Sequence, residues 1–167
     1  MFKVGIGQDS HRIQEPAAGK ALVLGGVVAK EAYALEGNSD SDVVLHAITN
    51  AVSGITGKPI LGPVADKLCK AGATDSAIYL QRALEDLDDA GYRLTHVSVT
   101  LECLRPKILP LLAAMTAKVA ELLGLAAEDV GITATSGEGL TDFGKGLGVQ
   151  AFAIATAVKE EMLARLG

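Results

Sequence analysis

Two short polar segments carry residues that could bind a metal ion. Asp9 and His11 lie two apart in GIGQDSHR, at the end of a run that is typical of a β-strand. In extended backbone, residues two apart face the same side, so both side chains can reach one ion. Asp42 and His46 lie one helical turn apart in SDSDVVLH and share a face. One carboxylate and two imidazoles, with His46 as third ligand, are typical of a catalytic zinc site, which keeps one position open.

The role of Asp42 stays open, because it could instead accept a hydrogen bond from the far nitrogen of His46 and fix that ring. Each of these residues could also have a purely structural role. A D-x-H triplet occurs by chance, and a lone histidine on a helix is often just a polar residue. His96, the third histidine, lies on an alternating strand and is predicted at the surface. Spacing alone does not establish that the two segments meet.

A glycine-rich segment, ATSGEGL followed by GKGLG, could bind phosphate. Such a turn exposes backbone N–H groups, and Glu138 within it would suit a divalent cation that bridges it to phosphates. Its spacing is not that of a P-loop, and a flexible glycine loop is the alternative. Arg105 and Lys107 flank a proline beside an expected helix start, which suits an anion, although both could be ordinary surface charges.

The elements that position these residues follow from hydrophobic periodicity. Strands are predicted over residues 2–7, 21–29, 95–104 and 129–135. Helices are predicted over residues 39–55, 75–90, 107–123 and 149–166, with Ser39 or Asp40 and then Asp75 or Ser76 as N-caps. Residues 58–73 are predicted as a loop with at most one short turn.

This order predicts an α+β fold, with helices packed on one face of a mixed, four-stranded sheet. The strands carry little charge, so we expect another subunit to cover the second face. The absence of linkers and repeats predicts one domain over residues 1–167.

Composition excludes several classes of protein. The 167 residues are 49% hydrophobic, which is enough for a packed core, and the net charge of −5 argues against nucleic acid or an anionic membrane as partner. No signal peptide or membrane span is recognisable. Cys69 and Cys103 lie far apart and suggest no disulfide framework, so we expect a cytoplasmic protein.

Together these segments resemble the 2-C-methyl-D-erythritol 2,4-cyclodiphosphate synthase family, lyases of the non-mevalonate isoprenoid pathway. The family's G-x-D-x-H is GQDSH here, and its S-D-G-D-x-x-x-H-A-x-x-D-A is SDSDVVLHAITNA. Its P-K pair after the third strand is Pro106-Lys107, and its T-T-x-E-x-L-G-F-x-G-R-x-E-G is TSGEGLTDFGKGLG. The order and spacing match over nearly the whole chain.

The resemblance implies a homotrimer whose sheets face each other, with active sites between subunits. It implies zinc held by Asp9, His11 and His46, and a second cation, magnesium or manganese, held by Glu138 and a diphosphate. The implied reaction converts 4-diphosphocytidyl-2-C-methyl-D-erythritol 2-phosphate to 2-C-methyl-D-erythritol 2,4-cyclodiphosphate and CMP. The 2-phosphate attacks the β-phosphorus, and CMP leaves.

The resemblance also implies which residues form the site. The implied catalytic residues are Asn38, Ser136 and Glu138. The implied substrate-binding residues are Asp9, Ser10, His11, Asn38, Ser39, Gly62, Cys103, Pro106, Lys107, Thr135, Ser136, Gly137, Glu138, Asp142 and Lys145.

Several positions depart from the family's motifs. Asn38 stands where the family has His, and Ser41 where it has Gly; Lys145 and Leu147 replace an Arg and a Glu. The G-D-I-G segment that contacts ribose is PILG here, and the lid motif after it is not recognisable in residues 63–73. Two alternatives therefore stay open. One is a relative with the same trimer and metal that acts on another phosphorylated substrate, and the other is a non-catalytic protein that binds a phosphate ligand.

Overall fold

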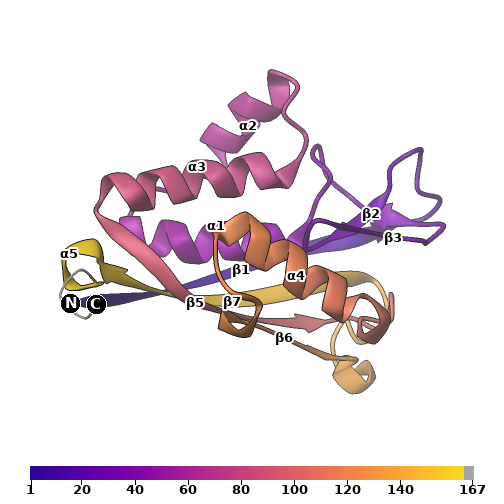
Figure 1. Ribbon diagram of the computed structural model, residues 1–167. Coiled ribbons are helices and arrows are strands. Elements are labelled where there is room, and N and C mark those ends of the chain that lie inside the picture. The colour runs from indigo at the N-terminus through magenta and orange to yellow at the C-terminus, as the bar shows by residue number, and fades with distance from the viewer. Residues whose placement is uncertain (164–167) are drawn as a thin grey trace.

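A five-stranded sheet underlies the structure, a computed structural model that describes residues 1–163 (Figure 1). The strands are β1 (Phe2–Gln14), β4 (Ala34–Leu35), β5 (Tyr92–Glu102), β6 (Val130–Thr135) and β7 (Gly148–Lys159), in the order β4-β1-β7-β5-β6. All neighbours are antiparallel except β5 and β6, which run parallel. The mixed sheet confirms the predicted α+β class.

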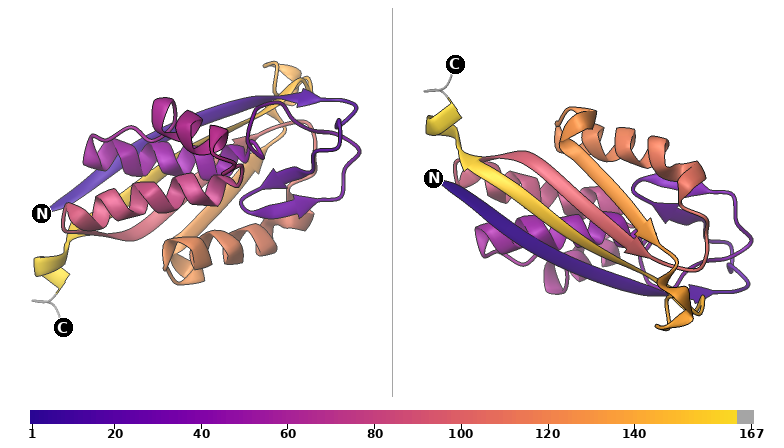
Figure 2. Two further views of the ribbon diagram at one scale, coloured as in Figure 1. Left: turned by 90° about the horizontal axis from the view of Figure 1, so that it is seen from above. Right: turned by 90° about the horizontal axis from the view of Figure 1, so that it is seen from below.

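The long helices lie on one face of this sheet (Figure 1). The helices are α1 (Val43–Thr56), α2 (Pro63–Lys70), α3 (Ser76–Asp89), α4 (Leu112–Leu123) and the short C-terminal α5 (Glu160–Leu163). Single 3-10 turns occur at η1 (Leu109–Leu111), η2 (Ala127–Asp129) and η3 (Gly137–Gly139). From the other side the strands are bare of helices (Figure 2, right). Among the described residues, no helix combines the length and apolar character needed to cross a membrane.

Two glycines let α1 lie directly on β1. A Cβ atom on Gly5 would fall 1.9 Å from the carbonyl oxygen of Ala51, and one on Gly7 would fall 2.0 Å from that of Ala47. No side chain can fit at either position, so the helix backbone packs against the strand. This close approach carries His46 toward the far end of β1.

The opposite face of the sheet is apolar and exposed. Residues of β1 and β7 that alternate with those beneath the helices include Phe2, Val4, Ile6, Phe152 and Ile154, each at least 42% exposed. Ile6 is directly paired with Ile154 across the two strands, so these side chains form one continuous patch. Such a contiguous apolar surface is typical of an interface.

Residues 149–166, predicted as a helix, were assigned wrongly. Residues 148–159 form the central strand β7, only 160–163 are helical, and 164–166 lie outside the described residues. The alanines of β7 favour a helix intrinsically, but they alternate with larger residues and are buried beneath α1. Pairing with β1 and β5 on both sides overrides that propensity. The sheet therefore has five strands rather than four. It includes β4 and β7, which were not predicted as strands, and it lacks the predicted strand at residues 21–29.

Two other predicted segments also differ. Residues 21–29 are not one strand but a hairpin outside the main sheet, formed by β2 (Leu22–Leu24) and β3 (Val27–Ala29). The predicted loop at 58–73 contains α2, which begins at Pro63. Proline is tolerated there because the N–H groups of the first helical turn have no partner within the helix. Helix α1 begins later than predicted because Asp42, rather than Ser39 or Asp40, is its N-cap, whereas Asp75 caps α3 as predicted.

Candidate functional site

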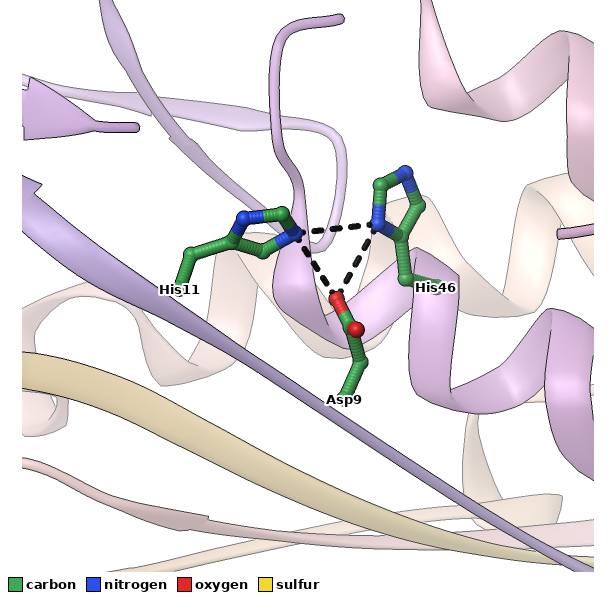
Figure 3. Close-up of side chains that lie close together, drawn as sticks. All are labelled: Asp9, His11 and His46. Atoms are coloured by element: carbon green, nitrogen blue, oxygen red, sulfur yellow. Dashed lines mark hydrogen bonds and ion pairs between the residues drawn. The ribbon is translucent and has the colours of Figure 1, made fainter. Parts of the chain in front are cut away.

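Asp9, His11 and His46 point toward one another where the far half of β1 passes the first turn of α1 (Figure 3). Asp9 Oδ2 lies 2.9 Å from His11 Nε2 and 3.0 Å from His46 Nδ1, and the two nitrogens are 3.3 Å apart. Ligands of a tetrahedral zinc ion at roughly 2.0–2.1 Å lie about 3.3 Å from one another. The triangle therefore has nearly the size that a zinc ion requires.

Hydrogen bonds at the outer nitrogens set the tautomer of both imidazoles. His11 Nδ1 lies 2.8 Å from the carbonyl oxygen of Glu36, to which its N–H donates. His46 Nε2 lies 2.8 Å from the hydroxyl of Ser76, and that hydroxyl donates to Asp40, so Nε2–H is the donor to Ser76. When the rings are neutral, each therefore carries its proton on the outer nitrogen and turns an unprotonated nitrogen toward Asp9.

This donor set fits a cation. Two imidazole lone pairs and a carboxylate converge on one point, and such a group of acceptors is stable only with a positive charge among them. In the metal-free protein, a proton on His11 is the source of positive charge that the geometry favours. Burial opposes ionisation of Asp9, but hydrogen bonds and charge from both histidines lower its pKa to about 2. Burial likewise opposes protonation of His11, yet Asp9 raises the pKa of His11 above 6.5.

Asp42 does not fix the His46 ring, so that alternative is wrong. Its carboxylate caps α1 by accepting the N–H groups of residues 44 and 45, both at 3.1 Å. It also accepts the N–H groups of Gly25 (2.9 Å) and Gly26 (2.6 Å). Asp42 thus ties the β2–β3 hairpin to the helix that carries His46, while Ser76 and Asp40 hold the ring itself.

A cavity of about 190 Å³ opens beside the three side chains. Three residues predicted from the resemblance line it: Asn38, Ser39 and Gly62. They do so together with Asp9, His11 and His46, which we call the triad. Sequence reasoning missed its other walls, which α2, the loop before it and α3 provide: Leu61, Ala65, Asp66, Cys69 and Tyr79. No local pattern marks them, because they come from segments distant in sequence that only the tertiary fold places beside Asp9, His11 and His46.

A second cavity, of about 270 Å³, collects another group of predicted residues. Its lining includes Cys103, Pro106, Lys107, Thr135 and Ser136, between the ends of β5 and β6 and the start of α4. Burial raises the pKa of the Cys103 thiol to about 11, so it is a neutral wall rather than a nucleophile.

Arg105 does not join Lys107 in an anion site as predicted. It is ion-paired with Glu15 at 2.9 Å, and its guanidinium lies 4.6 Å from the centre of the Tyr33 ring.

The remaining predicted residues lie in and around the glycine-rich loop. Glu138 has a positive φ of 51° and an exposed side chain that accepts a hydrogen bond from Ser136 at 3.3 Å. Ser10 and Asp142 border a further hollow at the end of β1, which His11 also lines, and Lys145 Nζ lies 3.8 Å from Asp142 Oδ1. The cavities at the triad and at Ser136 share no lining residue, so they are separate cavities within one chain.

Fold and site together describe an α+β protein with a candidate metal centre. A family model described as the YgbB family matches residues 2–158, and the chain therefore belongs to the YgbB family.

Named relatives extend this match. Over 160 residues the chain is 48% identical to 2-C-methyl-D-erythritol 2,4-cyclodiphosphate synthase of Chlamydia muridarum (strain MoPn / Nigg), covering 95% of this chain and 89% of the relative. A solved 2C-methyl-D-erythritol-2,4-cyclodiphosphate synthase superposes with a TM-score of 0.82 at 30% identity, covering 93% of this chain and 100% of the other. A CDP-bound form of such a synthase gives 0.81 at 28% identity, with the same coverage.

Proposed function

We propose that this chain converts 4-diphosphocytidyl-2-C-methyl-D-erythritol 2-phosphate to 2-C-methyl-D-erythritol 2,4-cyclodiphosphate and CMP. It would act as a metal-dependent phosphorus–oxygen lyase of non-mevalonate isoprenoid biosynthesis. The chain is an enzyme of the kind its relatives are named for. The observation that carries the proposal is the convergence of Asp9, His11 and His46 in a chain that matches those relatives almost end to end. The same match favours the synthase over the two alternatives.

Two cations complete the proposed site. Asp9, His11 and His46 would hold zinc, and Glu138 would hold magnesium or manganese together with the substrate diphosphate. When bound, these cations supply positive charge that neutralises crowded phosphates and polarises phosphoryl oxygens. The exposed carboxylate of Glu138 is free to reach such an ion.

The residues of the chain would hold the substrate in a folded conformation that brings its 2-phosphate close to its β-phosphorus. The nucleophile is an oxygen of the substrate's 2-phosphate, already an anion, so the step requires little base catalysis. This oxygen bonds to the β-phosphorus while the bond from that phosphorus to the CMP oxygen breaks. We assign the 2-phosphate end to the triad pocket, where Asn38 and Ser39 offer an amide and a hydroxyl. Gly62 and Ser10 complete the substrate contacts proposed at that end.

We assign the cytidine and its phosphates to the cavity beside Lys107. Its walls are mainly apolar, which suits a base, and its polar side chains are Lys107, Thr133, Thr135 and Ser136. Lys107 would neutralise the diphosphate, and the Ser136 hydroxyl would donate to it. The contacts proposed to support this end are Cys103, Pro106 and Gly137. Asp142 and Lys145 are proposed to contact the substrate from the hollow that Ser10 borders. The CDP in a solved neighbour supports a cytidine diphosphate ester as substrate.

A homotrimer would join these two ends of the proposed site. The exposed apolar patch on β1 and β7 supports packing of the sheets against one another, because its side chains would otherwise stay in water. The separation of the two cavities within one chain supports active sites between subunits. We also propose that residues 1–167 form one domain and that the enzyme is cytoplasmic, which its two free cysteines support.

The test is release of CMP from the proposed substrate with zinc and magnesium present. Wild-type protein should release CMP, and chelation of zinc should stop the release until zinc is restored. His46→Ala should be inactive and zinc-free. His96→Ala is the matched control, since His96 is an exposed histidine on β5, and it should keep its zinc. A folded, zinc-loaded wild type that releases no CMP would overturn the proposed substrate.

A further inference from the structure

Lys20 lies in the connection between β1 and β2 and directs its ammonium group at the segment that borders the triad pocket. Its Nζ donates to the carbonyl oxygens of Leu35 (2.8 Å) and Gly37 (3.0 Å) and to the hydroxyl of Ser41 (2.7 Å). An ammonium group has three N–H donors, so these three acceptors satisfy it completely. Lys20 therefore pins both ends of residues 35–41.

Ser41 explains why this segment requires a brace. Its φ is 58°, in the left-handed region that residues other than glycine rarely adopt, and its side chain is fully buried. The hydroxyl accepts from Lys20 and donates to the carbonyl oxygen of Ser39 at 3.4 Å. The bond from Lys20 thus offsets the strain of placing a serine at this position.

Residues 36 and 37 connect the segment that Lys20 holds to His11 of the triad. The carbonyl of Glu36 accepts the N–H of His11 Nδ1, and Glu36 lies between the two carbonyls that Lys20 holds. Gly37 lies between the side chains of Ser41 and His11. A Cβ there would fall 2.4 Å from Ser41 Oγ and 3.5 Å from Cε1 of His11. Moving the segment would therefore move the partner that sets the tautomer and orientation of His11.

We propose that Lys20 and Ser41 form a positioning pair that holds residues 35–41 in the conformation that orients His11 and presents Asn38 and Ser39 to the substrate. Lys20 acts through this segment and not by contact with the reacting atoms. The inference rests on the proposed zinc site and adds a determinant of its affinity. It also gives a role to the serine that replaces the family's glycine.

The test measures zinc affinity by competition with a chelator in four proteins: wild type, Lys20→Met, Ser41→Gly and the double variant. Lys20→Met should bind zinc about 10-fold more weakly, as expected for loss of an outer partner of a ligand. Glycine adopts a φ of 58° without strain, so the same change made with glycine at position 41 should cost clearly less. Lys30→Met, at an exposed lysine, is the matched control and should bind like wild type.

Two further measurements make the test decisive. Amide hydrogen exchange of residues 36–41 in the metal-free protein should be faster in Lys20→Met than in wild type, whatever the site binds. Lys20→Arg should recover only part of the affinity, because a planar guanidinium cannot satisfy three acceptors grouped around one point.

If Lys20→Met binds zinc and exchanges its amides like wild type, the positioning role is wrong while the zinc site stands. If the loss is equal with serine and glycine at position 41, the coupling of the pair is wrong. A wild type that binds no zinc would instead overturn the proposed site, and the exchange data would still decide whether Lys20 braces the segment.

Discussion

The two candidate binding regions of this chain are built in opposite ways. The triad stands on a long strand and a buried helix, and the outer nitrogen of each imidazole has a hydrogen-bond partner. The region of Ser136 and Glu138 is a loop whose polar contacts are mostly internal, as when Ser136 bonds to Glu138 and Thr141 to the N–H of Gly144. The triad, which we propose as the metal end of the site, is therefore organised by the core of one chain. The loop around Ser136, which we propose as the phosphate end, is organised mainly by contacts within itself.

The largest effect should come from disturbing the packing that organises the metal end. Gly7→Ala places a Cβ 2.0 Å from the carbonyl of Ala47, so α1 and His46 must shift away from β1. We expect a fall in Tm of roughly 5–10 °C and loss of zinc binding. Gly131→Ala, on β6, is the matched control, because its nearest neighbour would be 3.9 Å away. Zinc binding that survives Gly7→Ala would show that this contact does not position the site.

The next effect should separate the two ends by function. Lys107→Ala removes the ammonium group of the second cavity while leaving the triad untouched. Loss of a charge-assisted hydrogen bond predicts a fall in kcat/KM of about 10- to 100-fold. Zinc content measured on the same samples should stay at the wild-type value. Concurrent loss of zinc would mean that the two ends are not independent.

A smaller effect should follow from removing a partner of one ligand. Ser76→Ala leaves the Nε2–H of His46 without its acceptor, although the ring stays buried. Zinc should bind about 10-fold more weakly in chelator competition. Ser98→Ala, at a serine of β5 outside the triad pocket, should leave zinc affinity unchanged. Equal affinity of Ser76→Ala and wild type would assign the orientation of His46 to packing alone.

The smallest effect should be the pH dependence of stability in the metal-free protein. Asp9 raises the pKa of His11 above 6.5, so the protonated His11 contributes to the free energy of unfolding. That contribution is complete below pH 6.5 and is lost as the pH rises through the raised pKa. The pKa of Asp9 is lowered to about 2, so its contribution is full above 3.8 and is lost as pH falls toward 2. Urea unfolding should show both contributions between pH 3.8 and 6.5. In Asp9→Asn both dependences should disappear, and their persistence would place the ionisations elsewhere.

The sequence predicted the three clustered side chains of the triad better than the elements around them. Spacing on a strand places Asp9 and His11 on one face, because that period fixes which side chains share it. Spacing could not show that His46 meets them, and it wrongly grouped Asp42 with His46. Ser76 and Tyr79 could not be found this way, since they reach the site from α3 through tertiary packing. Strand β7 was missed because its alanines favour a helix in isolation, and only pairing on both sides makes it a strand.

The most direct test of the contrast between the two ends is to mix two variants that are each expected to be inactive. His46→Ala lacks the metal end and Ser136→Ala lacks the phosphate end. If each active site combines a metal end from one subunit with a phosphate end from another, random mixed trimers contain about one intact site in four. We therefore predict CMP release near a quarter of the wild-type rate from an equimolar mixture assembled together. No recovery from a mixture with restored trimers and zinc would mean that both ends of a site come from one chain.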